Sequence, residues 1–311
     1  MTTIAKTSTL ITDQQKDKVA DLGREACKAA VGKVNPTNDN VQKGVIEQGG
    51  EFKRRVQEAV EAIILDMTTP NKYADQVTES TSTYPKEYKG PKTIQMQIAM
   101  VSAQWGLDAA QALAYAENLP ELPEGAEGWF AIPRTEAIAA KLFPHVTDPI
   151  DRYCQAVNTA LAKLDESRSF TNYRKGEIDK KHLRGNARTI EKFGEVKQQQ
   201  QGDIIIIAAQ LGFKHRGESV NRAREIISST ANEYGLGALA VICIALTHPE
   251  RFVMWEQLHI DCAGDEFAPD GDGVFSGAPV LGFDDGGLGF VASGVSNTHG
   301  HYGSASGFVP Q

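Results

Sequence analysis

The most regular hydrophobic pattern in the chain is a stripe of five apolar residues spaced four, four, three and four positions apart: Phe52, Val56, Val60, Ile63 and Met67. This spacing matches the period of an amphipathic helix, and Pro70 predicts where that helix ends. An earlier helix is predicted from Thr12 or Asp13 to Gly32, followed by a turn at 35–40.

The next stretch of the chain, up to residue 201, also has a mainly helical pattern. The polar segment 71–90 predicts an exposed loop, and Gly106 predicts a break between two helices within 93–118. Further predicted elements are a short strand at 129–132, a helix that starts at Pro149 and a helix near 187–201.

The pattern changes after residue 201. Residues 204–207 are four consecutive isoleucines between Gly202 and Gly212, and β-branched residues in such a setting favour a buried strand. Helices are predicted at 219–234 and at 238–246, and the second is apolar on every side.

The segment beyond Phe252 has a β-like pattern. Apolar runs at 280–283 and 288–291 flank an Asp-Asp-Gly-Gly sequence at 284–287, which predicts a β-hairpin because a tight turn needs positive φ angles. No regular strand–helix alternation is present, so the expected fold class is α+β. We expect a mainly α-helical region at 1–201 and an α+β region with an acidic, glycine-rich β tail at 202–311.

Charge is distributed unevenly along the 311 residues. The formal net charge is −8, and the segment from Glu250 to Gln311 has nine acidic residues against one basic residue, Arg251, which accounts for all of it. The segment 168–224 has the opposite bias, with 13 Lys and Arg against six Asp and Glu. Three interpretations of the basic segment stay open: solvated helix faces, docking onto the acidic tail within or between chains, and binding of a protein or polyanion partner.

Composition argues against two classes of protein. The low pI of about 5.5 argues against a basic nucleic-acid-binding coat, and residues 109–115 contain no Lys or Arg for a DNA-reading helix, although nucleic acid is not excluded. No long apolar run predicts a membrane span, and no secretory signal is visible. Four widely spaced cysteines without a CxxC pair favour reduced thiols and a cytoplasmic protein.

The densest group of potential metal ligands comes from one acidic region of the chain: His259, Asp261, Asp265, Glu266, Asp270 and Asp272. Closely spaced carboxylates repel one another unless a cation or a basic group neutralises them, and Ca²⁺ and Mg²⁺ prefer oxygen ligands. The match to an EF-hand is incomplete because the twelfth position from Asp270 is Leu281. A solvated acidic turn and docking onto basic residues are therefore alternatives to a cation site.

A second pair of potential ligands is His299 and His301, whose spacing would let both bind one Zn²⁺ in an extended segment. If the tail folds back over the acidic loop, these histidines would form a mixed nitrogen and oxygen site with His259 and Asp261. An exposed glycine-rich tail is the alternative.

The basic residues Lys214, His215 and Arg216 lie between the isoleucine strand and the next helix, where a loop can bind an anion at a helix N-terminus. A basic surface loop without a ligand is the alternative. No nucleotide-binding glycine motif or nucleophile elbow is present.

Three runs in the C-terminal third carry a resemblance: 247–251 (Thr-His-Pro-Glu-Arg), 261–266 (Asp-Cys-Ala-Gly-Asp-Glu) and 302–308 (Tyr-Gly-Ser-Ala-Ser-Gly-Phe). This part of the chain resembles an uncharacterised protein family of candidate-phylum bacteria. No activity is attached to that family, so the resemblance implies no site and favours only an intracellular bacterial origin.

These observations lead us to expect a soluble intracellular binding or interaction protein, with Ca²⁺, Mg²⁺ or Zn²⁺ held near 261–272 as an added hypothesis. One alternative is a metal-dependent hydrolase in which His259, Asp261, Asp265 or His301 would bind the metal and Glu266 would act as general base. Another alternative is a self-associating structural protein, and the oligomeric state stays open.

Overall fold

The isoleucine run forms strand β4 (Ile204–Gln210), every residue of which is buried. In this computed structural model β4 belongs to a four-stranded antiparallel sheet, between β1 (Gly128–Pro133) and β11 (Ser306–Phe308). The fourth strand, β5 (Glu233–Gly235), pairs with β11. The strands predicted at 129–132 and from residue 204 are therefore confirmed.

The structure describes residues 12–34, 41–68, 71–284 and 286–310, and the chain divides into two units, Met1–Pro70 and Asn71–Gln311. The first unit contains α1 (Asp13–Val34), the π-helical turn η1 (Gln42–Ile46) and α3 (Gly49–Thr68).

Both helices predicted for the first unit are confirmed, but α1 continues past Gly32 to Val34. A helical glycine costs only about 1 kcal/mol relative to alanine, which is too little to end a helix. The turn predicted at 35–40 lies outside the described residues.

The second unit also contains a seven-stranded sheet, in which β10, β6, β8, β7 and β3 follow one another, β9 pairs with β8, and β2 pairs with β9. Its strands are β2 (Phe170–Asn172), β3 (Leu183–Gly185), β6 (His259–Asp261), β7 (Asp265–Phe267), β8 (Gly277–Asp284), β9 (Gly287–Gly294) and β10 (Tyr302–Ser304). The predicted hairpin is confirmed as β8 and β9, which pair from Gly277↔Gly294 to Asp284↔Gly287. Gly286 in the turn has a φ of 79°, which an L-residue rarely adopts.

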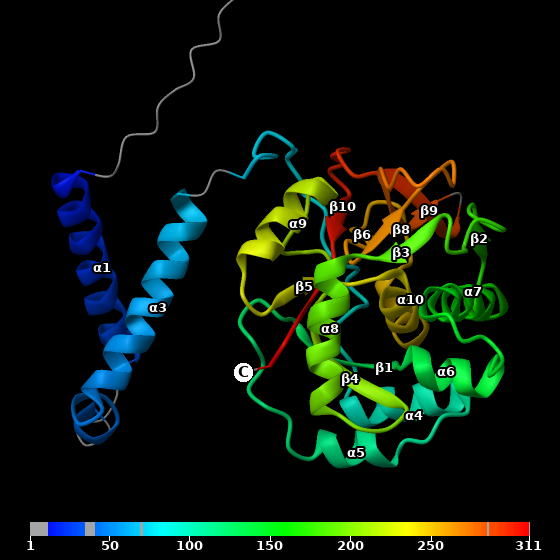
Figure 1. The fold of residues 1–311 in the computed structure, drawn as a ribbon, viewed down its shortest axis with the longest axis horizontal. Helices are drawn as coiled ribbons and strands as arrows, with labels where there is room; N and C mark the ends of the chain where they lie inside the picture. The colour runs from blue at the N-terminus through cyan, green and yellow to red at the C-terminus, as the bar shows by residue number, and fades with distance from the viewer. Residues whose placement is uncertain (1–11, 35–40, 69–70, 285, 311) are drawn as a thin grey trace, which may run out of the picture. The chain divides into compact units, whose positions relative to one another are not determined.

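The helices of the second unit, shown in Figure 1, surround these sheets. They are α4 (Ile94–Trp105), α5 (Ala110–Ala116), α6 (Thr135–Leu142), α7 (Pro149–Ser167), α8 (Ala187–Gln199), α9 (Val220–Ser229), α10 (Ala238–Thr247) and the 3₁₀ turn η2 (Pro249–Arg251). Every residue of α10 is buried, as its uniform hydrophobicity predicts. The fold is α+β, with helices mainly in the N-terminal part and strands mainly in the C-terminal region.

Two local predictions need correction. The helix predicted at 219–234 ends at Ser229, because Glu233–Gly235 forms a strand that pairs with the C-terminal strand β11.

The segment 71–90 forms no regular helix, but it is not simply exposed: Ser82, Pro85 and Tyr88 are buried. The Tyr88 ring packs edge-on against Tyr84 and so draws this loop into the core.

The basic segment 168–224 does contact the acidic C-terminal region, mostly through main-chain carbonyls. Arg184 pairs with Glu266 at 2.7 Å, whereas Arg168 donates to the carbonyls of Pro249 and Phe252, and Arg224 donates to those of Ala263 and Asp265. Strand β1 also pairs with β4 across the expected region boundary at residue 201, so the two expected regions share one sheet.

Within the described ranges, no helix is both long enough and apolar enough to cross a membrane.

Candidate functional site

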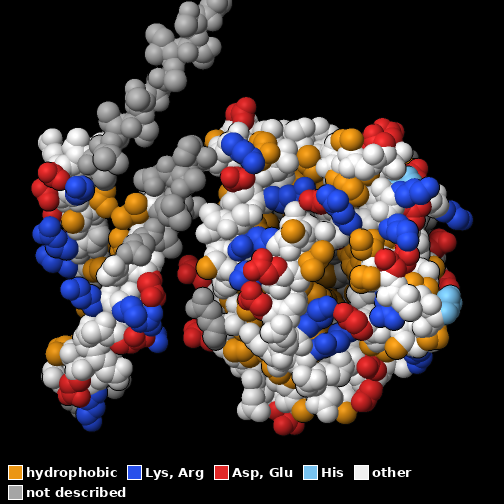
Figure 2. Space-filling view, viewed as in Figure 1, with side chains coloured by type: hydrophobic (Ala, Val, Ile, Leu, Met, Phe, Trp, Pro, Cys, Tyr) orange, Lys and Arg blue, Asp and Glu red, His pale blue; other side chains and the backbone are white. Residues whose placement is uncertain are grey.

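A cavity of about 310 Å³ opens on the second unit, between α6, α7, α8 and α10. In Figure 2, hydrophobic side chains gather in a hollow near the middle of this unit, with acidic and basic side chains around it. Much of the lining is apolar, with contributions from Ile132, Ile150, Ile190, Phe193, Leu236 and Leu239. A concave, mainly apolar site with few polar groups is typical of a small-molecule pocket.

Close backbone contact at three glycines shapes one wall of the cavity. The segment from Gly235 to Gly237 runs against Gly264, whose N–H donates to the Leu236 carbonyl at 2.9 Å. A β-carbon on Gly235 would lie 2.6 Å from the Gly264 nitrogen, so neither chain leaves room for a side chain here. This crossing brings the start of α10 beside the residue that follows Gly264, which is Asp265.

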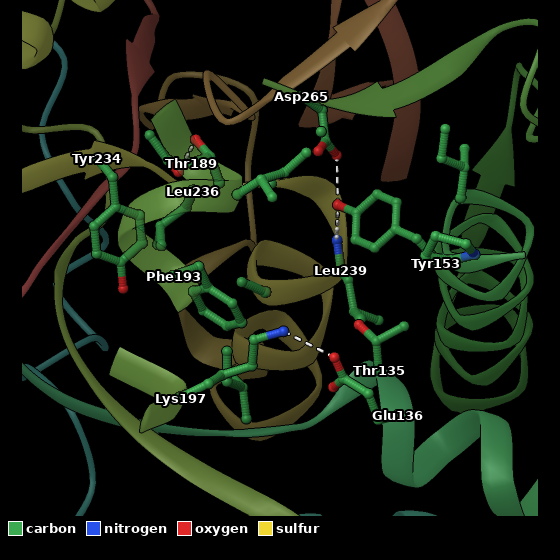
Figure 3. A pocket seen from close by; sticks show the side chains of 18 of the residues that line it. Thr135, Glu136, Tyr153, Thr189, Phe193, Lys197, Tyr234, Leu236, Leu239 and Asp265 are labelled. Carbon is green, nitrogen blue, oxygen red and sulfur yellow. Dashed lines mark hydrogen bonds and ion pairs between the residues drawn. The ribbon is translucent and has the colours of Figure 1, made fainter. Parts of the chain in front are cut away.

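Asp265 is the buried acidic residue of the cavity lining, and it is 1% exposed. Its Oδ2 accepts hydrogen bonds from the Tyr153 hydroxyl and the Ala238 N–H, both at 2.7 Å. Figure 3 shows Asp265 and Tyr153 facing each other on one side of the cavity. Because Gly237 has no side chain to cap α10, Asp265 performs that role from a distant part of the sequence.

Burial perturbs the ionisation of this pair. Burial raises the pKa of Asp265 to about 6, although the hydrogen bonds from Tyr153 and Ala238 and the charge of Arg224 oppose the rise. Burial also raises the pKa of Tyr153 well above its usual value, so this phenol keeps its proton and stays a donor to the carboxylate.

The second carboxylate oxygen of Asp265 is differently placed. Among the described residues, Oδ1 has no hydrogen-bond partner. A β-carbon on Gly237 would lie 2.7 Å from Oδ1, so the glycine leaves this oxygen uncovered. The cavity therefore has an open carboxylate oxygen on a mainly apolar surface, in addition to the Tyr234 hydroxyl, which also has no partner among the described residues.

The cavity also has a charged rim, formed by the ion pair between Lys197 Nζ and Glu136 at 2.8 Å. The two side chains are 29% and 55% exposed, in contrast to the buried Asp265. Burial alone would raise the pKa of Glu136, but the hydrogen bond from Lys197, a backbone hydrogen bond and the charges of Lys197 and Arg134 together outweigh it and lower that pKa. Because its charge is matched by Glu136, Lys197 is a poor partner for an incoming anion.

The structure separates most of the predicted metal ligands. Asp265 lines the cavity, whereas the charge of Arg224 acts on Asp261. Asp270 and Asp272 are exposed on a loop, where Asp272 accepts a hydrogen bond from the Val274 N–H. In the described part of the chain, no group of three or more His, Cys, Asp or Glu residues lies where it could hold a metal ion. Glu266, the predicted general base, is paired with Arg184 and also accepts from Asn186.

The tail does fold back on the strand that carries His259 and Asp261, because β10 pairs with β6 in parallel. The His259 N–H donates to the His301 carbonyl at 2.7 Å, and both imidazole rings lie near the Trp255 ring. The His301 ring is hydrogen-bonded to the Ser82 hydroxyl, and the His299 ring packs against Tyr302. The histidines therefore meet in an aromatic cluster.

The predicted anion loop is neutralised by the chain's own carboxylates. His215 is 2% exposed and lies between Glu218 and Glu233, at 3.0 and 3.1 Å. Lys214 also pairs with Glu233. Arg216 stacks on the Phe213 ring and donates to the Ser82 carbonyl. Two of the three predicted anion ligands thus have carboxylate partners.

Comparisons with protein-family models, with curated proteins and with solved structures find no match for this chain. A function therefore has to be argued from the chemistry of the site.

Sequence reasoning selected Asp265 as a metal ligand but missed Tyr153 and the cavity. One signal was present: the entirely apolar helix after Gly237 has no capping residue of its own, which implies a cap supplied from elsewhere.

Proposed function

We propose that this chain is a binding protein that takes up a small, mainly apolar molecule in the cavity between α6, α7, α8 and α10. The observation that carries the proposal is the combination of a mainly apolar cavity of about 310 Å³ with a buried carboxylate, Asp265, that has one open oxygen. Apolar surface supplies affinity in such sites, and one or two placed polar groups orient the ligand.

The setting that we propose is a reducing cytoplasm. Cys154, Cys243 and Cys262 are buried free thiols, and burial raises the pKa of each of them, which keeps them protonated and unreactive. Such thiols need no oxidising compartment and behave as small hydrophobic residues.

The proposal is tested with 4-phenylbutanol, a neutral apolar probe, followed by methyl NMR of the leucine and isoleucine residues. We expect saturable shifts at Ile132, Leu236 and Leu239, and loss of binding in Ala240→Phe, which places a ring in the cavity. Ala99→Phe, on an exposed position of α4, is the matched control and should bind normally. Binding that survives in Ala240→Phe, or no binding to the wild type, would overturn the proposal.

A further inference from the structure

Two buried residues of the cavity lining have a polar group without a hydrogen-bond partner in the described part of the chain: the Tyr234 hydroxyl, which can donate or accept, and Asp265 Oδ1, which can only accept and carries negative charge. Asp265 Oδ2 already receives the Tyr153 hydroxyl and the Ala238 N–H, whereas Oδ1 lines the cavity without a partner in the described part of the chain. Figure 3 shows the carboxylate directed toward the space between α10 and the surrounding side chains. A ligand group that meets this oxygen must therefore donate.

The charges around Asp265 favour a cationic donor over a neutral one. Arg224 is the cation whose charge acts on Asp265. Its guanidinium donates hydrogen bonds to main-chain carbonyls, and its charge also interacts with the carboxylates of Glu266 and Asp261. Arg184 pairs with Glu266. Above pH 7, where Asp261 is mostly ionised as well, two guanidinium groups face three carboxylates, which leaves one negative charge to be matched.

The N-terminus of α10 partly offsets this charge without matching it. A helix N-terminus carries roughly half a positive charge, and its Ala238 N–H is directed at Oδ2. An anionic ligand group finds no free cation inside, because Lys197 on the rim is paired with Glu136. An ammonium group would gain a charge-assisted hydrogen bond to a carboxylate that is only 1% exposed.

We propose that the natural ligand is an amphipathic amine, with an apolar body in the cavity and a protonated amino group on Asp265 Oδ1. This inference rests on the proposed function, because it concerns the same cavity and specifies which end of the ligand is buried. Tyr153 and Ala238 act as positioning residues, since they hold Oδ2 and so direct Oδ1 toward the ligand.

The test compares three probes of matched shape by calorimetry near pH 8: 4-phenylbutylamine, 4-phenylbutanol and 4-phenylbutyrate. We expect the amine to bind at least about tenfold more tightly than the alcohol, and the carboxylate to bind most weakly. If the alcohol binds and the amine binds no better, this inference is overturned while the proposed function stands. If none of the three binds, the proposed function itself fails.

A variant pair locates the effect. Asp265→Asn keeps an acceptor for Tyr153 but removes the charge, so the advantage of the amine over the alcohol should fall to about twofold or less. Asp270→Asn removes one negative charge from an exposed loop and should leave the advantage intact. An amine preference that persists in folded Asp265→Asn would contradict the inference. If Asp265→Asn does not fold, the ranking of the three probes on the wild type decides.

Discussion

Gly307 lies directly against the hydroxyl end of the Tyr234 ring. A β-carbon at position 307 would be 2.5 Å from Tyr234 Cζ and 2.6 Å from its hydroxyl oxygen. Tyr234 is fully buried in β5, which pairs with the strand that contains Gly307, and its ring contributes to the wall of the cavity. The pairing of β5 and β11 therefore depends on the absence of a side chain at this position.

Gly307→Ala is expected to destabilise the second unit by about 1–3 kcal/mol, because the buried ring can move aside only by disturbing its neighbours. Urea unfolding followed by tryptophan fluorescence measures the change. Gly194→Ala is the control: no atom lies within 4 Å of its would-be β-carbon on α8, and alanine there should be neutral or stabilising. Equal stability of Gly307→Ala and wild type would show that β11 can shift.

The cluster of His215 with two carboxylates predicts a pH-dependent contribution to stability. Burial alone would lower the pKa of His215, but hydrogen bonds to Glu218 and Glu233 outweigh it and raise that pKa above the ordinary 6.5. Stability from a raised histidine pKa is fully present below 6.5 and is lost as the pH rises through the folded-state value. Burial would raise the pKa of Glu233, but His215 and Lys214 lower it to about 2, so its contribution is lost only in acid.

We therefore expect His215→Gln to reduce the free energy of unfolding more near about pH 6 than near about pH 9. Thermal and urea unfolding at both pH values measure the difference. His145→Gln, at an exposed position, is the control and should show no such trend. A constant difference across this range would mean that His215 does not change its protonation between those values.

Asp261 also makes stability fall as the pH rises, because its folded-state pKa is raised, but here the group itself is a cost to the folded state when ionised. Burial raises the pKa of its carboxyl to about 7, against a smaller opposing effect of Arg224. A raised carboxyl pKa means that the folded state holds the proton longer, so stability falls as the pH rises from the ordinary value toward about 7.

Asp261→Asn should therefore stabilise the protein above neutral pH and have little effect near about pH 4. Thermal unfolding measures the change, and the exposed Asp270→Asn serves as a control with the same charge change.

Thermal unfolding repeated with Ca²⁺, Mg²⁺ and Zn²⁺ tests the cation hypothesis. If Asp261 is a ligand, Asp261→Asn should abolish a metal-induced rise in melting temperature that the wild type shows.

Arg251 is a fully buried cation whose removal should be severe. Its guanidinium donates to the carbonyls of Leu258 and Leu211 and stacks on the Tyr84 ring at 4.1 Å. Arg251→Met should reduce the free energy of unfolding by about 3 kcal/mol or more, because two buried carbonyls lose their donors. Arg184→Met removes a half-exposed arginine and should cost about 1 kcal/mol or less. Similar losses in the two variants would contradict the assigned role of Arg251.

The elements that sequence predicted well are those whose signals are local. The four isoleucines of β4, the apolar helix α10 and the Asp-Gly turn between β8 and β9 each carry their structure in a few adjacent residues. The helix predicted across 219–234 was wrong at its end, because Glu233–Gly235 gains strand hydrogen bonds from residues more than 70 positions away.

The site needed information that no local pattern contains. The carboxyl group of Asp265 was visible as a candidate from sequence, but its partner Tyr153 lies 112 positions away and its role as the cap of α10 depends on the crossing at Gly264. Sequence alone thus determined the helices, the hairpin and the uneven charge, because these follow from neighbouring residues. Only the tertiary structure decided which of the acidic residues is buried beside a cavity, because desolvation and long-range contacts arise when distant segments pack together.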